Sequence, residues 1–174
     1  MDTMATRVFL LGILAFVAIS LSAPSPAAAA GGDDAPPRTG SAAKPEDVEY
    51  AAAVAAIKSG DFTGAIRRLE GVVARDGTNA DAYNWLAYAI RQDGDPTRSI
   101  PLYQKALAID PNHRGAHEYI GEAYLALDNV GKAKEHLARL NSLCFFPCSE
   151  YRDLKKAIEA YEKSGGKVKP TAGR

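Results

Sequence analysis

The sequence predicts an all-α protein in which one helix-turn-helix unit is repeated three times. The first observation is a constant step along the chain, from position 46 to position 80 and on to position 114, which aligns small and apolar residues without a gap. The second is that this repeat step also aligns three short polar turns, Gly60-Asp61, Gly94-Asp95 and Asp128-Asn129. The third is that small side chains fall where two helices would have to pack closely. These observations predict three pairs of helices around tight turns.

Four columns of this alignment carry the residues that would hold each pair together. They are Ala53, Ala87 and Gly121; Ala65, Ser99 and Ala133; Leu69, Tyr103 and Leu137; and Val72, Ala106 and Leu140. The small residues let the second helix of a unit approach the first, and the larger residues fill the space beside them. The predicted helices span 46–59, 62–75, 80–92, 96–109, 114–127 and 130–143.

The turn residues indicate how each unit is connected. Asp61, Asp95 and Asn129 can each accept a hydrogen bond from free amides at the start of the second helix. Glycines such as Gly60 tolerate the left-handed backbone that ends the first helix. Pro101 removes a backbone donor inside the fourth helix, which predicts a kink or a late start there.

The middle unit, residues 80–113, resembles a tetratricopeptide repeat (TPR). It reads ADAYNWLAYAIRQDGDPTRSIPLYQKALAIDPNH, with Leu86-Ala87 at the leucine-small pair and Asp110-Pro111 closing the repeat. Units 46–79 and 114–147 match less closely, and the third ends in Cys-Phe-Phe-Pro instead of Asp-Pro. The resemblance implies a right-handed superhelix of three TPR units over residues 46–147.

A capping helix is expected over residues 148–163. The repeat step continues the apolar stripe to Tyr151, Leu154 and Ile158. Lys155 stands where the units have a small residue and would block a following helix, so this helix should end the stack. It should present Lys155, Lys156, Glu159 and Glu162 to water. Ser149 is its predicted N-cap.

The first thirty residues predict a secretory signal peptide. Arg7 precedes an apolar run over residues 8–21, and Ala28 and Ala30 provide the small residues of a cleavage site. Cleavage after Ala30 would leave a periplasmic or secreted protein without a stable membrane span. The alternative is an uncleaved anchor, although the run is short for a bilayer.

Two further segments have little to bury. Residues 31–45 and 164–174 are rich in glycine, proline and small residues, which predicts a disordered linker and a disordered tail. The segment 144–161, which reads CFFPCSEYRDLKKAIEAY, resembles the end of small exported bacterial TPR proteins with a C-x3-C capping segment. That resemblance implies export and supplies no activity.

Cys144 and Cys148 are the only cysteines, and in an exported protein they predict a structural disulfide. Two buried free thiols, or a redox or metal-handling site, are the alternatives. A metal site would need more ligands, and the only histidines are His113, His117 and His136. His117 takes a position where the repeats place a packing aromatic, so it is expected in the core. No metal and no other cofactor is expected.

Charge and motifs narrow the classes of function. Lys plus Arg and Asp plus Glu number 21 each, so the net charge favours neither nucleic acid nor an anionic membrane as a partner. We find no nucleophile triad, phosphate-binding loop or paired-carboxylate motif, so no catalytic residue is predicted and the protein is expected not to be an enzyme. Glu118 and Glu122, one helical turn apart, suit either a cation or a solvated face.

The TPR resemblance implies that the first helices line a concave groove that binds a peptide or helix of another protein. The implied groove residues are Tyr50, Val54 and Ile57; Asn84, Tyr88 and Arg91; and Glu118, Glu122 and Leu125. Their character changes from apolar through aromatic to acidic, which suits a segment with an apolar part and a basic part. We therefore expect an assembly or scaffold role. A solvated face and the thiol or metal role remain alternatives, and neither partner identity nor oligomeric state follows from the sequence.

Overall fold

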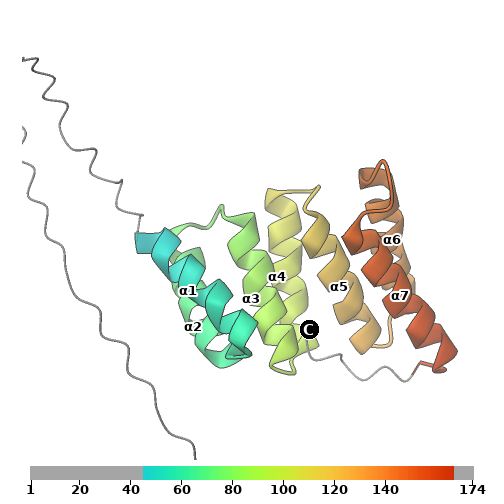
Figure 1. The fold of residues 1–174 in the computed structure, drawn as a ribbon, viewed down its shortest axis with the longest axis horizontal. Coiled ribbons are helices and arrows are strands. Elements are labelled where there is room, and N and C mark those ends of the chain that lie inside the picture. The colour runs from blue at the N-terminus through green and yellow to red at the C-terminus, as the bar shows by residue number, and fades with distance from the viewer. Residues whose placement is uncertain (1–44, 167–174) are drawn as a thin grey trace, which may run out of the picture. The chain divides into compact units, whose positions relative to one another are not determined.

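A computed structural model describes residues 45–166, and seven helices lie side by side along this part of the chain (Figure 1). They are α1 (Pro45–Ser59), α2 (Phe62–Arg75), α3 (Ala80–Gln92), α4 (Pro96–Ile109), α5 (Arg114–Ala126), α6 (Val130–Leu143) and α7 (Ser149–Lys163). The all-α fold is confirmed, and each boundary lies within one residue of its predicted position. The predicted signal peptide, most of the linker and most of the tail lie outside the described residues.

The turns within the units form as their residue types predict. Asp61 accepts a hydrogen bond from the Gly64 amide at 2.8 Å, and Asp95 and Asn129 cap α4 and α6 in the same way. Gly60 adopts a left-handed backbone with a φ of 81°. In the third unit Asp128 takes that position with a φ of 57°, because aspartate tolerates the left-handed region better than most residues do.

Three details at the helix ends narrow or differ from the expectations. Pro45, assigned to the linker, opens α1, where its missing amide hydrogen leaves no bond unmade. Of the two alternatives expected at Pro101, the late start is excluded, because α4 begins at Pro96 and runs through Pro101. Ser164–Gly166, assigned to the tail, form a turn that ends α7, in which the Gly166 amide donates to the Tyr161 carbonyl.

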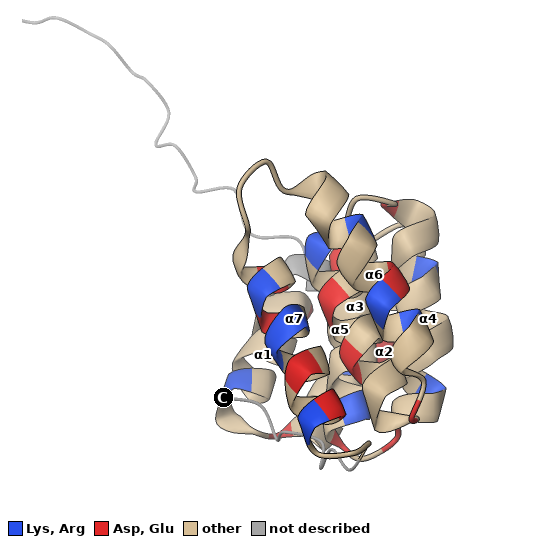
Figure 2. Cartoon of the chain, turned by 90° about the vertical axis from the view of Figure 1, so that its right-hand side faces the viewer, with Lys and Arg blue, Asp and Glu red and all other residues tan. Residues whose placement is uncertain are grey.

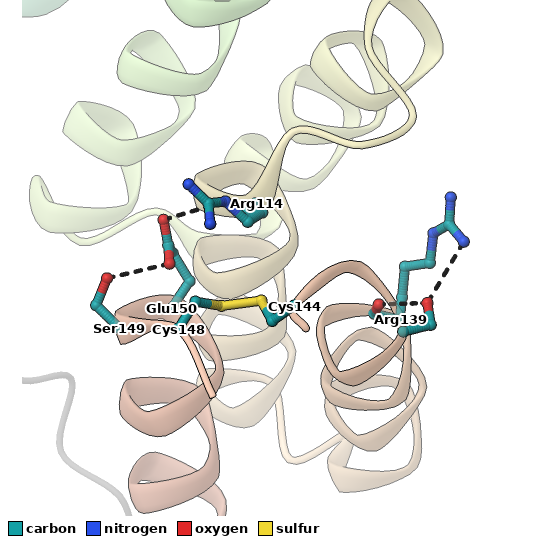
Figure 3. Close-up of a disulfide and its surroundings, with 7 residues drawn as sticks. Arg114, Arg139, Cys144, Cys148, Ser149 and Glu150 are labelled. Carbon is teal, nitrogen blue, oxygen red and sulfur yellow. Dashed lines mark hydrogen bonds and ion pairs between the residues drawn. A yellow bond between two sulfur atoms is a disulfide. The ribbon is translucent and has the colours of Figure 1, made fainter. Parts of the chain in front are cut away.

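Ser149 is not the N-cap of α7. Cys148 occupies that position and makes no capping bond through its side chain, because its sulfur is bonded to Cys144. Ser149 is already helical, and its hydroxyl donates to a Glu150 carboxylate oxygen at 3.0 Å (Figure 3). The disulfide therefore moves the start of the last helix relative to the capping residue that the sequence suggests.

The aligned columns form the core between the helix layers. Ala53, Leu69, Tyr103 and Leu140 are fully buried, whereas Leu137 is partly buried. Gly121 contacts α7 as well as its own unit, because its nearest side-chain neighbour across the helices is Leu154. Gly121, a member of the column of small residues, therefore also allows α5 to pack closely against α7.

α7 packs on both α5 and α6 and presents charged residues to water, as predicted for a cap (Figure 2). The four residues predicted to face water, Lys155, Lys156, Glu159 and Glu162, are all exposed. Among the helices of residues 45–166, none is long and apolar enough to cross a membrane.

Candidate functional site on the first helices

The structure divides the nine predicted groove residues into three groups. Ile57 and Leu125 are packed in the hydrophobic core and are not presented at the surface. The partly buried residues are Tyr50, Val54, Tyr88 and Glu122. The buried polar residues are Asn84, Arg91 and Glu118. The last two groups, on α1, α3 and α5, supply the candidate binding surface.

Three aromatic rings join α3 to α5 at the centre of this surface. The ring of Tyr88 lies 4.9 Å from that of Tyr119 and 5.5 Å from that of Trp85, measured between centroids. Trp85 and Tyr119 are themselves 6.4 Å apart. These separations are within the range of favourable aromatic pairs, so the cluster fixes the position of Tyr88.

Arg91 lies behind these rings with only 4% of its surface exposed. Its Nη2 atom is 2.8 Å from a carboxylate oxygen of Glu122. Its guanidinium carbon is 5.4 Å from the centroid of Tyr88 and 5.9 Å from that of Tyr119. Arg91 thus already interacts with Glu122 and with the faces of two aromatic rings. It is therefore not available to bind an acidic ligand.

Glu118 is the exception among the buried charged residues, because it is 9% exposed and makes no hydrogen bond or ion pair with another described residue. Burial, reinforced by the nearby charges of Glu122, Asp153 and Glu150, raises the pKa of Glu118 to about 8. The pKa of Glu122 is also raised by burial, and Arg91 opposes that rise. Arg91 also opposes the rise of the Glu118 pKa, but less strongly than burial raises it. The third unit therefore contains a buried carboxyl group that forms no ion pair within residues 45–166.

The capping helix contributes acidic residues to the same surface. Asp153 and Glu150 of α7 both act electrostatically on Glu118. Glu150 also approaches the Nε atom of Arg114 at 3.7 Å (Figure 3). Trp85, Tyr119 and Asp153 were not among the binding residues predicted from the sequence. These residues share one column of the repeat alignment, so the repeat register contained the signal that relates them.

Asn84 adds a neutral polar group beside the aromatic cluster. It is buried, and its Oδ1 atom has no hydrogen-bond partner within the described part of the chain. A buried acceptor without a donor is uncommon and unfavourable. A backbone amide of a bound segment would satisfy it.

The two cysteines pair with each other, and so do two of the three histidines. Cys144 and Cys148 form the predicted disulfide, with their Cα atoms 5.8 Å apart (Figure 3). His117 is buried as predicted, and its Nδ1 atom lies 2.9 Å from Nδ1 of His136. Within residues 45–166, no group of three or more His, Cys, Asp or Glu side chains is placed to hold a metal ion.

Solved structures of low sequence identity share this fold. The first TPR domain of Spaghetti (RPAP3), solved with the HSP90 peptide SRMEEVD, has a TM-score of 0.60 and 20% identity, and the match covers 67% of this chain and 93% of that chain. The Yersinia enterocolitica chaperone SycD, solved with a peptide of the translocator YopD, has a TM-score of 0.60 and 15% identity, covering 68% and 93%. These similarities establish an α-solenoid of TPR units.

Sequence comparisons give the same family. Tetratricopeptide repeat protein 1 of Schizosaccharomyces pombe is 30% identical over 91 residues, which are 49% of this chain and only 9% of that protein. Two models of the tetratricopeptide repeat match residues 50–114 and 91–158. Residues 50–158 of this chain are therefore covered by matches to the tetratricopeptide repeat family.

Proposed function

We propose that this protein is a noncatalytic interaction module that binds a basic segment of a partner protein across α1, α3 and α5. The partner segment is an extended peptide or a helix with apolar and cationic side chains. We further propose that the module is exported, as its first thirty residues predict, and acts as an assembly or scaffold factor. The observation that carries the binding proposal is the buried carboxyl group of Glu118, which forms no ion pair within residues 45–166.

The electrostatics of the surface favour a cationic ligand. A buried carboxylate is unfavourable unless a positive group or several donors accompany it. Arg91 is already bound to Glu122, and Arg114 lies beside Glu150. An arginine or lysine of the partner would supply the charge that Glu118 lacks and would also face Asp153.

The neighbouring groups suit the remainder of such a segment. Trp85 and Tyr88 offer aromatic surface for apolar or cationic side chains. The free Oδ1 atom of Asn84 can accept a hydrogen bond from a backbone amide of the ligand. The groups on α3 would position the segment, and the acidic groups on α5 and α7 would select its charge.

The similar structures support peptide binding as the general role. The HSP90 peptide bound by one of them has the opposite charge from the ligand that this surface favours. RPAP3 and SycD were each solved with a peptide of another protein. The HSP90 peptide carries two glutamates and one aspartate. The acidic residues around Glu118 would repel such a ligand, so we propose the opposite charge preference for this chain.

Calorimetric titration with designed peptides tests the binding proposal. Two peptides would share the same apolar residues and differ only in carrying either four arginines or four glutamates, with SRMEEVD as a further acidic probe. We expect the arginine peptide alone to bind. Glu118→Gln and Tyr88→Ala should each weaken it by about tenfold or more. Tyr83→Ala, on the same helix but facing α2 and α4, is the matched control.

Either of two results would overturn the binding proposal. One is binding of the glutamate peptide as tightly as the arginine peptide. The other is an unchanged affinity in Glu118→Gln. The export proposal has a separate test, because mass spectrometry of the chain recovered from cells should find an amino terminus within a few residues of Gly31. Retention of Met1 would contradict export with cleavage.

A further inference from the structure

The connection between α6 and α7 exposes two large apolar side chains. Phe145 is 95% exposed and Phe146 is 76% exposed, and their rings pack edge to face with centroids 4.9 Å apart. The disulfide between Cys144 and Cys148 closes this five-residue loop (Figure 3). The loop contains no charged residue, and in Figure 2 it rises beyond the ends of the two helices. We call Phe145 and Phe146 the phenylalanine pair.

A hollow with a mostly apolar lining lies elsewhere on the molecule. It has a volume of about 450 Å³ and lies between α2, α3 and α4. Leu86 and Ile90 are buried beneath it, and Tyr83, Leu102 and Pro101 also line it. An ion pair between Glu70 and Arg98, with 3.1 Å between the atoms, lies at its edge.

The next unit fills the corresponding positions with polar rings. The repeat step relates Tyr83, Ile90 and Leu102 to His117, Tyr124 and His136. There, His117 and His136 lie within hydrogen-bonding distance of each other, and the ring of Tyr124 stacks on that of His136. Tyr83, Ile90 and Leu102 give the hollow a mostly apolar lining. The corresponding residues of the next unit, His117, Tyr124 and His136, contact one another instead. The apolar hollow is therefore not a general consequence of the repeat. It is a feature of the first two units, which contribute α2, α3 and α4.

We propose that the phenylalanine pair of one copy inserts into the apolar hollow of a second copy. The two surfaces are complementary in kind, because the loop offers uncharged aromatic rings and the hollow offers an apolar lining large enough for a small ligand. Insertion buries no charge from the loop. Glu70 and Arg98 stay paired with each other at the edge, where they remain about half exposed.

The geometry of this contact determines the kind of assembly. The phenylalanine pair follows α6 and the hollow lies between α2 and α4, so each copy uses two different surfaces. Such a head-to-tail contact leaves one pair and one hollow free and allows further copies to add. Two aromatic side chains bury only about 150–250 Å² each, so the association is weak and depends on protein concentration.

Sedimentation velocity of the full chain tests this proposal. The unmodified protein should show a sedimentation coefficient that increases with concentration. The pair variant, Phe145→Ser with Phe146→Ser, should remain monomeric. The hollow variant, Pro101→Glu, places a charge at an exposed lining position and should also remain monomeric. Pro101→Ala is its matched control, because it also restores the backbone amide but adds no charge. Val48→Ser, which removes another exposed apolar side chain, should associate normally.

A mixture of the two monomeric variants gives the sharpest result. It contains one intact hollow, on the pair variant, and one intact phenylalanine pair, on the hollow variant. The mixture should form a one-to-one dimer and nothing larger. Circular dichroism should show unchanged helicity in every variant.

Four results would overturn the proposal. The first is an unmodified chain that stays monomeric at millimolar concentration, and the second is association of Pro101→Glu equal to that of Pro101→Ala. The third is a mixture that stays monomeric. The fourth is a pair variant that associates normally and loses only its binding to phosphatidylcholine vesicles. The last result would assign the phenylalanine pair to a lipid surface. The peptide titrations depend on Tyr88 and Glu118, which do not line the hollow, so failure of one proposal is distinguishable from failure of the other.

Discussion

Gly121 of α5 lies directly against Leu154 of α7, and a Cβ atom on Gly121 would come within 2.6 Å of Leu154 Cδ2. The absence of a side chain at this position lets the capping helix pack as the next member of the row formed by α1, α3 and α5. The acidic residues of α7 depend on this approach to reach Glu118. One glycine therefore links the packing of the cap to the charge of the candidate site.

Gly121→Ala is expected to destabilise the protein although alanine is the better helix former. The new methyl group would force Leu154 or α7 to move, which should reduce the free energy of unfolding by about 1–3 kcal/mol. Gly115→Ala is the matched control in α5, because the nearest atom to its Cβ would be at 3.5 Å, an ordinary contact. It should be neutral or stabilising by about 0.5–1 kcal/mol. Urea denaturation measures both, and equal stability of the two variants would contradict the contact.

The affinity for the arginine peptide is expected to rise with pH. The pKa of Glu118 is raised to about 8, chiefly by burial, and only its ionised form attracts a cation. Between pH 6 and pH 9 the affinity should increase by about tenfold, and binding near pH 7 should release a proton. Titrations in buffers of different ionisation enthalpy measure that release. Glu118→Gln should bind weakly at every pH, so a parallel rise in this variant would assign the effect to another group.

Acid is expected to destabilise the protein through the histidines between α5 and α6. Burial, reinforced by His117, lowers the pKa of His136 to about 4, and burial also lowers the pKa of His117. The unfolded chain, with histidine pKa values near 6.5, then binds more protons than the folded chain. This contribution to stability is therefore fully present above about pH 6.5 and is lost as pH falls towards 4.

His136→Leu isolates that contribution, because leucine stands at the corresponding position of the preceding unit, Leu102. The unmodified protein should lose about 1–2 kcal/mol more than the variant between pH 7 and pH 4.5, a range that allows for the partial exposure of His136. Glu118 acts in the opposite direction, since a raised carboxyl pKa contributes stability that is lost as pH rises through 8. It contributes equally to both proteins. Parallel pH profiles from urea denaturation would contradict the role of His136.

Removal of the disulfide is expected to weaken the attachment of α7. The bond between Cys144 and Cys148 closes a loop of five residues, which corresponds to about 2 kcal/mol in the chain-entropy account. Replacement of both cysteines by serine should lower the free energy of unfolding by about that amount. Hydrogen exchange should show the largest loss of protection in α7. Loss of protection confined to α1 and α2 would contradict this assignment.

The sequence alone determined the helices and the turns of this protein. Their signals are local, because Asp61 caps the helix that begins at the next residue and Gly60 supplies a left-handed turn within its own unit. The repeat step also identified the aligned core columns, since every unit has to bury the same face. The prediction of Ser149 as the N-cap of α7 was wrong, because the disulfide between Cys144 and Cys148 places Cys148 at that position.

The tertiary structure decided which groups meet on the first helices. Arg91 lies next to Glu122 and Glu118 lies near Asp153, although the members of each pair belong to different helices and are distant in the chain. Whether a charge is paired, buried or free depends on the spacing between helices, and that spacing is set by side chains such as Gly121 and Leu154. A repeat register gives the face on which a residue lies. Only the packed helices give the distances, and electrostatic and aromatic interactions are determined by distance.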